Sequence, residues 1–336
     1  MGSDNIYVGV DLHKRQFYEV RLASDGEVIR RRRWSTEMDQ VSAFAESLDR
    51  HHRLVVEPVE NSYWFLEQVA GYAGSVHIAN TCRVRLIAES RLKSDRIDAH
   101  TLADLLRVGY LPEVYLPCPE MQAVRRLISS RVSLVRDRTR LKNRISGLVA
   151  REGYRVRASD PFGRSGRREL ASMPLSTPLR RLVDGQLAIV DVLTTQVSRL
   201  DAEIEAIASS DPITRRLRTI DGLGAFSALA VRAMVDQMER FRSVKAFASY
   251  TGLIPGYRQS GDSYHPGGIT KQGSRLLRWV LIQAVPHVIR HNSRLRKLYT
   301  RLCYRSSVGR ARVAVAHGLA KIIYHVWTQD RCYYRC

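Results

Sequence analysis

Apolar residues along the first third of the chain fall into short runs that are typical of strands. Runs at 6–10, 17–22 and 27–34, with the turn signal SDG before the last, predict three antiparallel strands. Two more strands are predicted over 53–59 (RLVVEPV) and 75–81 (SVHIANT). The sequence therefore predicts a sheet that starts with two hairpin connections.

Helical stretches separate these runs. Ser35 or Thr36 can cap a helix that runs to about Leu48, and 62–74 (SYWFLEQVAGYAG) predicts a helix closed by glycine. The stretch 92–106 (LKSDRIDAHTLADLL) predicts another helix. The alternation indicates a mixed α/β fold with helices covering the sheet.

Heptad spacing dominates the middle of the chain, after the proline-rich stretch LPEVYLPCPE at 111–120. One seam holds Val124, Leu127, Leu134, Leu141, Ile145 and Leu148, and a second holds Val190, Leu193, Val197, Leu200, Ile204 and Ile207. Arg131 and Arg138 make the first seam imperfect. The pattern predicts a coiled-coil region. Pairing within one chain is slightly favoured over a pair that also dimerises.

The last third is predicted to be mostly helical. An alanine-rich helix follows the turn IDGLG. A glycine-rich polar loop over 252–274 lies between this helix and two further helices near the end of the chain. No strong strand signal occurs in this region. The predicted divisions are an α/β domain at 1–115, a helical coiled-coil region at 116–210, a C-terminal domain at 211–328 and a tail at 329–336.

The net charge of the chain says more about its function than its apolar content does. The 336 residues include 44% apolar residues, enough for packed cores, but 54 Lys and Arg against 33 acids give a net charge of +21. Such an excess points first to nucleic acid and second to an anionic membrane surface. Because no apolar run could span a bilayer and no signal peptide begins the sequence, a membrane partner is not expected. Five scattered cysteines without a CxxC pair predict a reducing cytoplasm.

Four carboxylates form the first candidate site. Asp11 and Glu57 end apolar runs, and Asp95 and Asp98 share one helix face at i, i+3 spacing. Each alone is ordinarily a turn residue or part of a solvated face. Together, in a strongly basic chain, they favour a magnesium site, of the two-metal type that serves phosphoryl transfer. Glu60 is an alternative to Glu57, although its place at a helix start suits a role at the helix dipole.

A serine in the glycine-rich loop is the second candidate. Ser260 precedes a glycine in YRQSGDSYHPGG, where Ser263 is equally available and His265 is expected to be a loop residue. From composition alone, Ser-Gly is ordinary turn chemistry, because a serine hydroxyl attacks phosphate only when activated. The predicted nucleic-acid contacts around both sites are Lys14, Arg91, Lys93, Arg96, Gly222, Gly224, Arg258, Lys271 and Arg275. The two glycines belong to a turn that can offer backbone N–H groups to phosphate.

Six motifs in order carry a family resemblance. They are YVGVDLHK, VVEPVENSYW, KSDRIDAHTLADLL, IDGLG, FASYTGLIPGYRQSG and KQGSRLLRWVLIQA. Together they resemble the DEDD transposases of the insertion sequence one-ten family, the bridge-RNA-guided recombinases of bacterial mobile elements. The resemblance covers roughly residues 5–325.

The resemblance implies a ribonuclease-H-like (RuvC-like) domain, a coiled-coil linker and a C-terminal transposase domain with a catalytic serine. The family acids fall on Asp11, Glu57, Asp95 and Asp98, and the serine falls on Ser260. It also implies donor and target DNA duplexes and a structured non-coding guide RNA as partners. The resemblance further implies that the protein forms dimers or tetramers. It also implies a location in the bacterial cytoplasm, on the nucleoid when DNA is bound.

Three other functions compete. A RuvC-like nuclease of the junction-resolvase type would use the same acids with water and form no covalent intermediate. An architectural nucleic-acid-binding protein would need neither the acids nor the serine. An actin-like ATPase shares the VGVD opening, but LHKRQ follows Asp11 in place of a glycine-rich phosphate loop.

Overall fold

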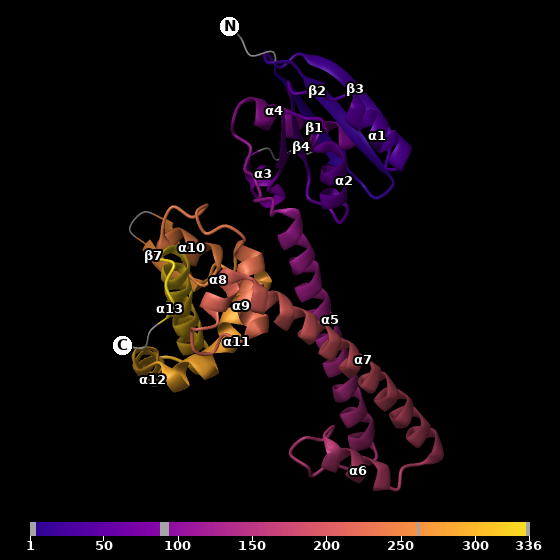
Figure 1. The fold of residues 1–336 in the computed structure, drawn as a ribbon, viewed down its shortest axis with the longest axis vertical. Coiled ribbons are helices and arrows are strands. Elements are labelled where there is room, and N and C mark those ends of the chain that lie inside the picture. The colour runs from indigo at the N-terminus through magenta and orange to yellow at the C-terminus, as the bar shows by residue number, and fades with distance from the viewer. Residues whose placement is uncertain (1–4, 88–93, 261–262, 334–336) are drawn as a thin grey trace. The chain divides into compact units, whose positions relative to one another are not determined.

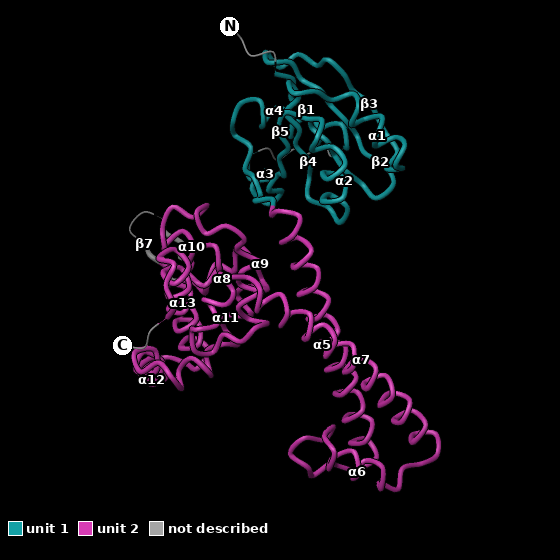
Figure 2. The backbone as a smooth tube through the Cα atoms, viewed as in Figure 1, with its two compact units in different colours: residues 1–116 teal, residues 117–336 magenta. Residues whose placement is uncertain are grey.

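The computed structural model describes residues 5–87, 94–260 and 263–333. The chain divides into two compact units, residues 1–116 and 117–336 (Figure 2).

Unit 1 is built on a five-stranded sheet in the order β3-β2-β1-β4-β5 (Figure 1). The strands are β1 (Ile6–Leu12), β2 (Gln16–Leu22), β3 (Val28–Ser35), β4 (His52–Val56) and β5 (Ser75–Ile78). The first three are antiparallel, whereas β4 is parallel to both β1 and β5. The predicted mixed α/β class is confirmed, and the order fits the ribonuclease-H-like sheet that the resemblance implies.

Helices cover both faces of this sheet. The helices of unit 1 are α1 (Met38–Glu46), α2 (Ser62–Val69), α3 (Thr81–Ile87) and α4 (Asp95–Arg107). An apolar core that contains Val8, Val10 and Leu12 packs against Phe44 of α1 and Phe65 of α2. On the opposite face, a smaller core joins β2 to α4. Successive side chains of β1 therefore alternate between α1 and α2 on one side and α4 on the other.

A polar network is enclosed in the apolar interior of unit 1. Glu19 is fully buried and accepts hydrogen bonds from Arg21 and from Trp34 Nε1, the latter at 2.6 Å. Arg21 also donates to the Ser47 carbonyl oxygen at 2.9 Å and lies 3.0 Å from His52 Nε2. The pair is buried at little cost because its remaining donors and acceptors are satisfied.

Gly9 lets α4 lie directly on β1. A Cβ atom at this position would come within 1.9 Å of the Ala99 carbonyl oxygen and 2.8 Å of the Ala103 backbone nitrogen. Only a residue without a side chain permits this approach of helix to strand. The position of α4, and of the acids in its first turn, depends on Gly9.

Unit 2 is mostly helical, as predicted. Two long helices, α5 (Pro119–Arg151) and α7 (Thr177–Ser210), pack side by side, with α6 (Arg164–Ser172) between them in the chain. The remaining helices are α8 (Pro212–Leu217), α9 (Ala225–Val235), α10 (Val244–Tyr250), α11 (Arg275–His291), α12 (Ser293–Arg305) and α13 (Val308–Thr328). They share a large apolar core with the start of α5 and the end of α7.

The buried face of α5 matches the predicted seam only in part. Val124 and Ile145 of that seam are buried, but its leucines are only half-buried, and Ile128, Val132 and Val149 are buried in addition. In α7, Val190, Val197 and Ile204 are buried as the seam predicts. Arg131, which interrupts the predicted seam, forms a bidentate ion pair with Asp201 of α7 at 2.8 and 3.2 Å.

The expectation of a strandless loop over 252–274 is wrong. The chain there forms a two-stranded antiparallel hairpin, β6 (Pro255–Ser260) and β7 (Ser263–Ile269). Two prolines and three glycines in these strands remove most of the apolar alternation by which a strand is recognised.

Substitution Gly9→Ala tests the close packing of α4. We expect it to lower the free energy of unfolding by at least about 2 kcal/mol, because the added methyl group overlaps backbone atoms that cannot move singly. Gly71→Ala is the matched control, since a Cβ there meets no atom within 4 Å. Denaturant unfolding of the full chain measures both. Equal stability of the two variants would contradict the packing argument.

Candidate active site

Asp11 lies at the end of β1 on the side that faces α4. Gly9, two residues earlier, touches the α4 backbone, so the strand alternation directs Asp11 to the same side. The residue is only 4% exposed. A carboxylate in such a position is costly unless a positive partner or hydrogen bonds compensate it.

The first turn of α4 supplies the two other aspartates. Ser94 caps this helix, because its side chain accepts a hydrogen bond from the Ile97 backbone N–H at 3.3 Å. Asp95 and Asp98 both belong to the first turn and are half-buried. At a helix N-terminus the backbone N–H groups favour negative charge, which offsets part of the cost of gathering carboxylates there.

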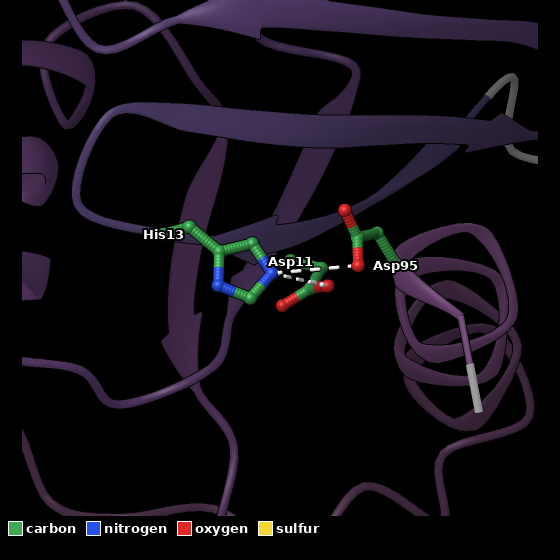
Figure 3. A group of neighbouring side chains, drawn as sticks. All are labelled: Asp11, His13 and Asp95. Atoms are coloured by element: carbon green, nitrogen blue, oxygen red, sulfur yellow. Dashed lines mark hydrogen bonds and ion pairs between the residues drawn. The ribbon is translucent and has the colours of Figure 1, made fainter.

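His13 joins the acids and was not predicted. Its Nε2 atom lies 3.2 Å from Asp11 Oδ2 and 3.5 Å from Asp95 Oδ1 (Figure 3). Ligand atoms of these three residues all lie within 4.8 Å of one another. The signal was present in VDLHK, where a histidine follows the strand aspartate by two positions. The imidazole is half-exposed, so it forms the solvent side of the cluster.

Glu57 follows β4 directly, and the parallel pairing of β1 with β4 places it at the same sheet edge as Asp11. Its backbone N–H continues the ladder to the Val10 carbonyl oxygen at 3.3 Å. The Glu57 charge acts on Asp11, whereas Glu60, which is exposed, is not among the groups that do.

The pKa of Asp11 is raised from 3.8 to about 6. Burial is the largest cause, the His13 imidazole lowers the pKa, and the charges of Glu57, Asp95 and Asp98 raise it further. The other three predicted acids therefore all influence the buried Asp11 carboxyl group. Such a cluster carries more negative charge than its surroundings compensate, which is the environment that a divalent cation with oxygen ligands fits.

The charged side chains among the predicted nucleic-acid contacts are exposed wherever the structure describes them. Lys14 and Arg96 are exposed near the acids, whereas Arg91 and Lys93 lie outside the described residues. Lys271 and Arg275 are exposed beside the β6–β7 hairpin, and the backbone of Arg258 belongs to β6. Gly222 and Gly224 form the turn before α9, where Gly222 has a φ of +87° and the turn lines a cleft of about 620 Å³.

Ser260 belongs to unit 2, whereas the acids belong to unit 1. It is the last residue of β6 and pairs with Ser263 of β7. Its side chain is outside what the structure describes. The hairpin places both candidate serines at one tip, next to the residues that join the strands.

Comparison with known proteins agrees with the geometry. A family model for the DEDD transposase of IS110 elements matches residues 8–152, and one described as the transposase IS116/IS110/IS902 family matches residues 214–300. The first range contains the four acids, and the second contains Ser260.

Three relatives cover most of the chain. A probable family 20 transposase of Pseudomonas aeruginosa is 30% identical over 266 residues, or 74% of this chain and 78% of that protein. The transposase for insertion sequence element IS1111A of Coxiella burnetii is 28% identical, over 73% and 69%. The transposase for insertion sequence element IS1328 of Yersinia enterocolitica is 24% identical over 96% of both chains.

The DEDD family model matches the part of the chain that holds the mixed sheet and its acids, so the chain is a DEDD transposase, an enzyme that recombines DNA and whose acidic site implies divalent metal. The chain belongs to the IS116/IS110/IS902 family of transposases. Among the described residues, every helix is too short or too polar to cross a membrane.

The raised pKa of Asp11 predicts a pH dependence that Asp11→Asn removes. A folded-state pKa near 6 means that the folded protein holds this proton more tightly than the unfolded chain does. The resulting stability is complete below about pH 4 and is lost as the pH rises to about 6. In a chelator, the variant should gain stability over the wild type across this window, by up to about 3 kcal/mol. Asp39→Asn, at an exposed position of α1, is the control. A stability difference for Asp11→Asn that does not change between pH 4 and 7 would contradict the assignment.

Proposed function

We propose that this transposase is an RNA-guided, site-specific DNA recombinase of a bacterial insertion sequence, acting in the cytoplasm where its DNA substrate lies. The observation that carries the proposal is that three acids, Glu57, Asp95 and Asp98, act on the buried Asp11 carboxyl group within a chain of net charge +21. The acids supply the metal site for phosphoryl transfer, and the positive charge supplies affinity for nucleic acids.

Asp11, Glu57, Asp95 and Asp98 are proposed as ligands of Mg²⁺ in a two-metal arrangement. When bound, the ions lower the energy of the charge that develops on attacking and leaving oxygens. His13 contacts Asp11 and Asp95 and restrains both carboxylates. Asp11, with its pKa near 6, changes its protonation state close to neutral pH and so couples metal occupancy to pH.

Ser260 is proposed as the nucleophile. Its Oγ forms a bond to a DNA phosphorus while the bond from that phosphorus to the 3′ oxygen breaks. The serine proton is lost and the departing 3′ oxygen gains one, which leaves a phosphoserine link to the 5′ strand end. The acids and the serine belong to different units, so this reaction requires the units to close on each other, within one chain or across a dimer.

The helical pair α5–α7 is proposed as a coiled-coil region that links the α/β domain at 1–115 to the catalytic-serine domain at 211–328 and takes part in forming dimers or tetramers. Leu182, Ile189 and Val192 of α7 support a further contact, since they are spaced by seven and three residues and are 51–60% exposed. Such a stripe is typical of a helix face that packs on a partner.

A structured guide RNA is the proposed source of target choice. Base pairing would select donor and target DNA, while the protein holds backbones through its positive charge. Purification of the protein from its native context, followed by sequencing of bound RNA, tests this partner directly.

Metal binding can be measured without catalysis. We expect Mg²⁺ at pH 7.5 to raise the thermal stability of the full chain by about 1–3 kcal/mol, because ligand binding to the folded state alone is stabilising. The gain should be lost in Asp11→Asn and retained in Asp39→Asn. Equal stabilisation of all three proteins would argue against a site at Asp11.

The covalent intermediate distinguishes the serine mechanism from hydrolysis by a RuvC-like nuclease. We expect Ser260→Ala to abolish protein–DNA adducts on denaturing gels while DNA binding persists. Ser263→Ala is the matched control because the two serines pair across the same hairpin. Adducts that survive in Ser260→Ala, or vanish only in Ser263→Ala, would remove Ser260 from the reaction. Strand cleavage by the wild type without any adduct would favour the nuclease.

A further inference from the structure

The C-terminal helices form a cleft that the proposed chemistry does not use. It has a volume of about 990 Å³ and is lined by the end of α11, by α12 and by α13. Residues 241–336, which include these helices, contain 17 Lys and Arg and only two acids. The cleft therefore opens in a strongly basic part of the chain.

Two basic stripes line the cleft. Helix α12 contributes Arg294, Lys297 and Arg301, which are spaced by three and four residues and so share one face. Helix α13 contributes a second stripe at spacing four: His317, Lys321 and His325. The two helices pack against each other, so that the stripes line one continuous surface.

Gly318 lies at the contact between these helices. A Cβ atom at Gly318 would lie 2.9 Å from Leu295 Cδ2, so a larger residue would require the Leu295 side chain to shift. Leu295 is buried at this contact. The apolar floor is closed by small and aliphatic residues, and the charged side chains stand around it.

Positive charge in the cleft is poorly compensated. Within the described part of the chain, Arg294, Lys297, Arg301 and Lys321 form no ion pair or hydrogen bond. Asp221 is the single acid among the described lining residues. Burial and the neighbouring Lys321 charge lower the pKa of His317, which is the expected response to a site of positive potential.

The chemistry of the lining indicates a phosphate backbone as the ligand. The lining combines apolar residues, including Leu298 and Ile322, with four long cationic side chains that can pair with phosphate groups. Binding sites for single-stranded nucleic acid offer aromatic side chains on which the bases stack. Apart from histidines, Tyr333 is the one aromatic residue among the described lining residues, and its hydroxyl accepts a hydrogen bond from Asn292 Nδ2 at 2.6 Å. A duplex, whose bases are already stacked, suits the cleft better.

A neighbouring cleft extends this surface. Asp221 also lines the smaller cleft at the turn before α9, which holds Gly222, Gly224 and His287. The backbone N–H groups at the start of α9 are not capped by a side chain. A backbone that lies along α12 and α13 can therefore continue toward the α9 turn and its helix dipole.

We propose that the cleft between α12 and α13 binds the phosphate backbone of double-stranded DNA. The proposal rests on DNA being the substrate of this transposase, and it adds a binding surface distinct from both the acids and Ser260. Contact with phosphate is independent of sequence, so the surface positions DNA without selecting a target.

Charge-neutral substitutions test the surface. In the full chain, Lys297→Gln with Arg301→Gln should weaken binding of a fluorescein-labelled DNA duplex of arbitrary sequence by about tenfold at low salt. The slope of log affinity against log salt should become shallower by about two. Arg305→Gln with Arg312→Gln is the matched control, because both residues are exposed on the same helices, lie outside the cleft and remove the same charge. The control should retain nearly full affinity.

Equal losses in the two double variants would overturn the proposal, since only net charge would then matter. Loss of affinity for a structured RNA with unchanged affinity for the duplex would also overturn it. A third double variant, Lys297→Arg with Arg301→Lys, keeps both charges. Duplex affinity close to that of the wild type in this variant would support contact with phosphate. Thermal melts check that the variants fold. The Ser260→Ala adduct assay does not depend on this surface. A negative result in the duplex-binding assay would therefore not contradict the serine mechanism, and loss of the serine mechanism would not contradict this surface.

Discussion

Burial of a single carboxyl group, that of Asp11, is the constraint around which unit 1 is organised. The strand that carries it packs apolar side chains on its other face, so Asp11 has no outward position to adopt. Gly9 then permits α4 to approach the strand, and the approach adds the charges of Asp95 and Asp98. Each of these steps makes the metal-free site less favourable. The helix N-terminus and His13 offset only part of that cost, and a cation offsets the rest.

Charge is distributed unevenly along the chain, and the unevenness has a functional meaning. The acids gather at one sheet edge of unit 1, whereas residues 241–336 contain 17 basic residues and only two acids. A DNA phosphate is repelled by an acidic cluster without metal and is attracted by the basic region. Retention of DNA can therefore be strong in the basic region without metal, while reaction depends on metal loading of an acidic site that has little affinity of its own for DNA.

Sequence patterns identified the sheet and its acids because both are local. A strand aspartate and a helical i, i+3 pair are visible in short stretches, and the parallel strand order predicts that they meet at one edge. His13 was missed because a histidine after a strand is common and only its contact with Asp95, from a distant helix, distinguishes it. The β6–β7 hairpin was missed because prolines and glycines obscure strand alternation. In α5, the leucine heptads predicted the helix but not its buried face, since Arg131 pairs with Asp201.

The basic cleft shows a different limit of sequence reasoning. Each stripe alone is an ordinary solvated helix face, and its charges are separated along the chain by apolar residues that belong to the core. The stripes become one surface only because α12 and α13 pack in contact. Repulsion among these charges works against that packing, so the apolar contacts of Leu295 and the α13 core must exceed it. A polyanion would reverse the sign of this electrostatic contribution, and the helix pair should then be more stable with DNA bound than without it.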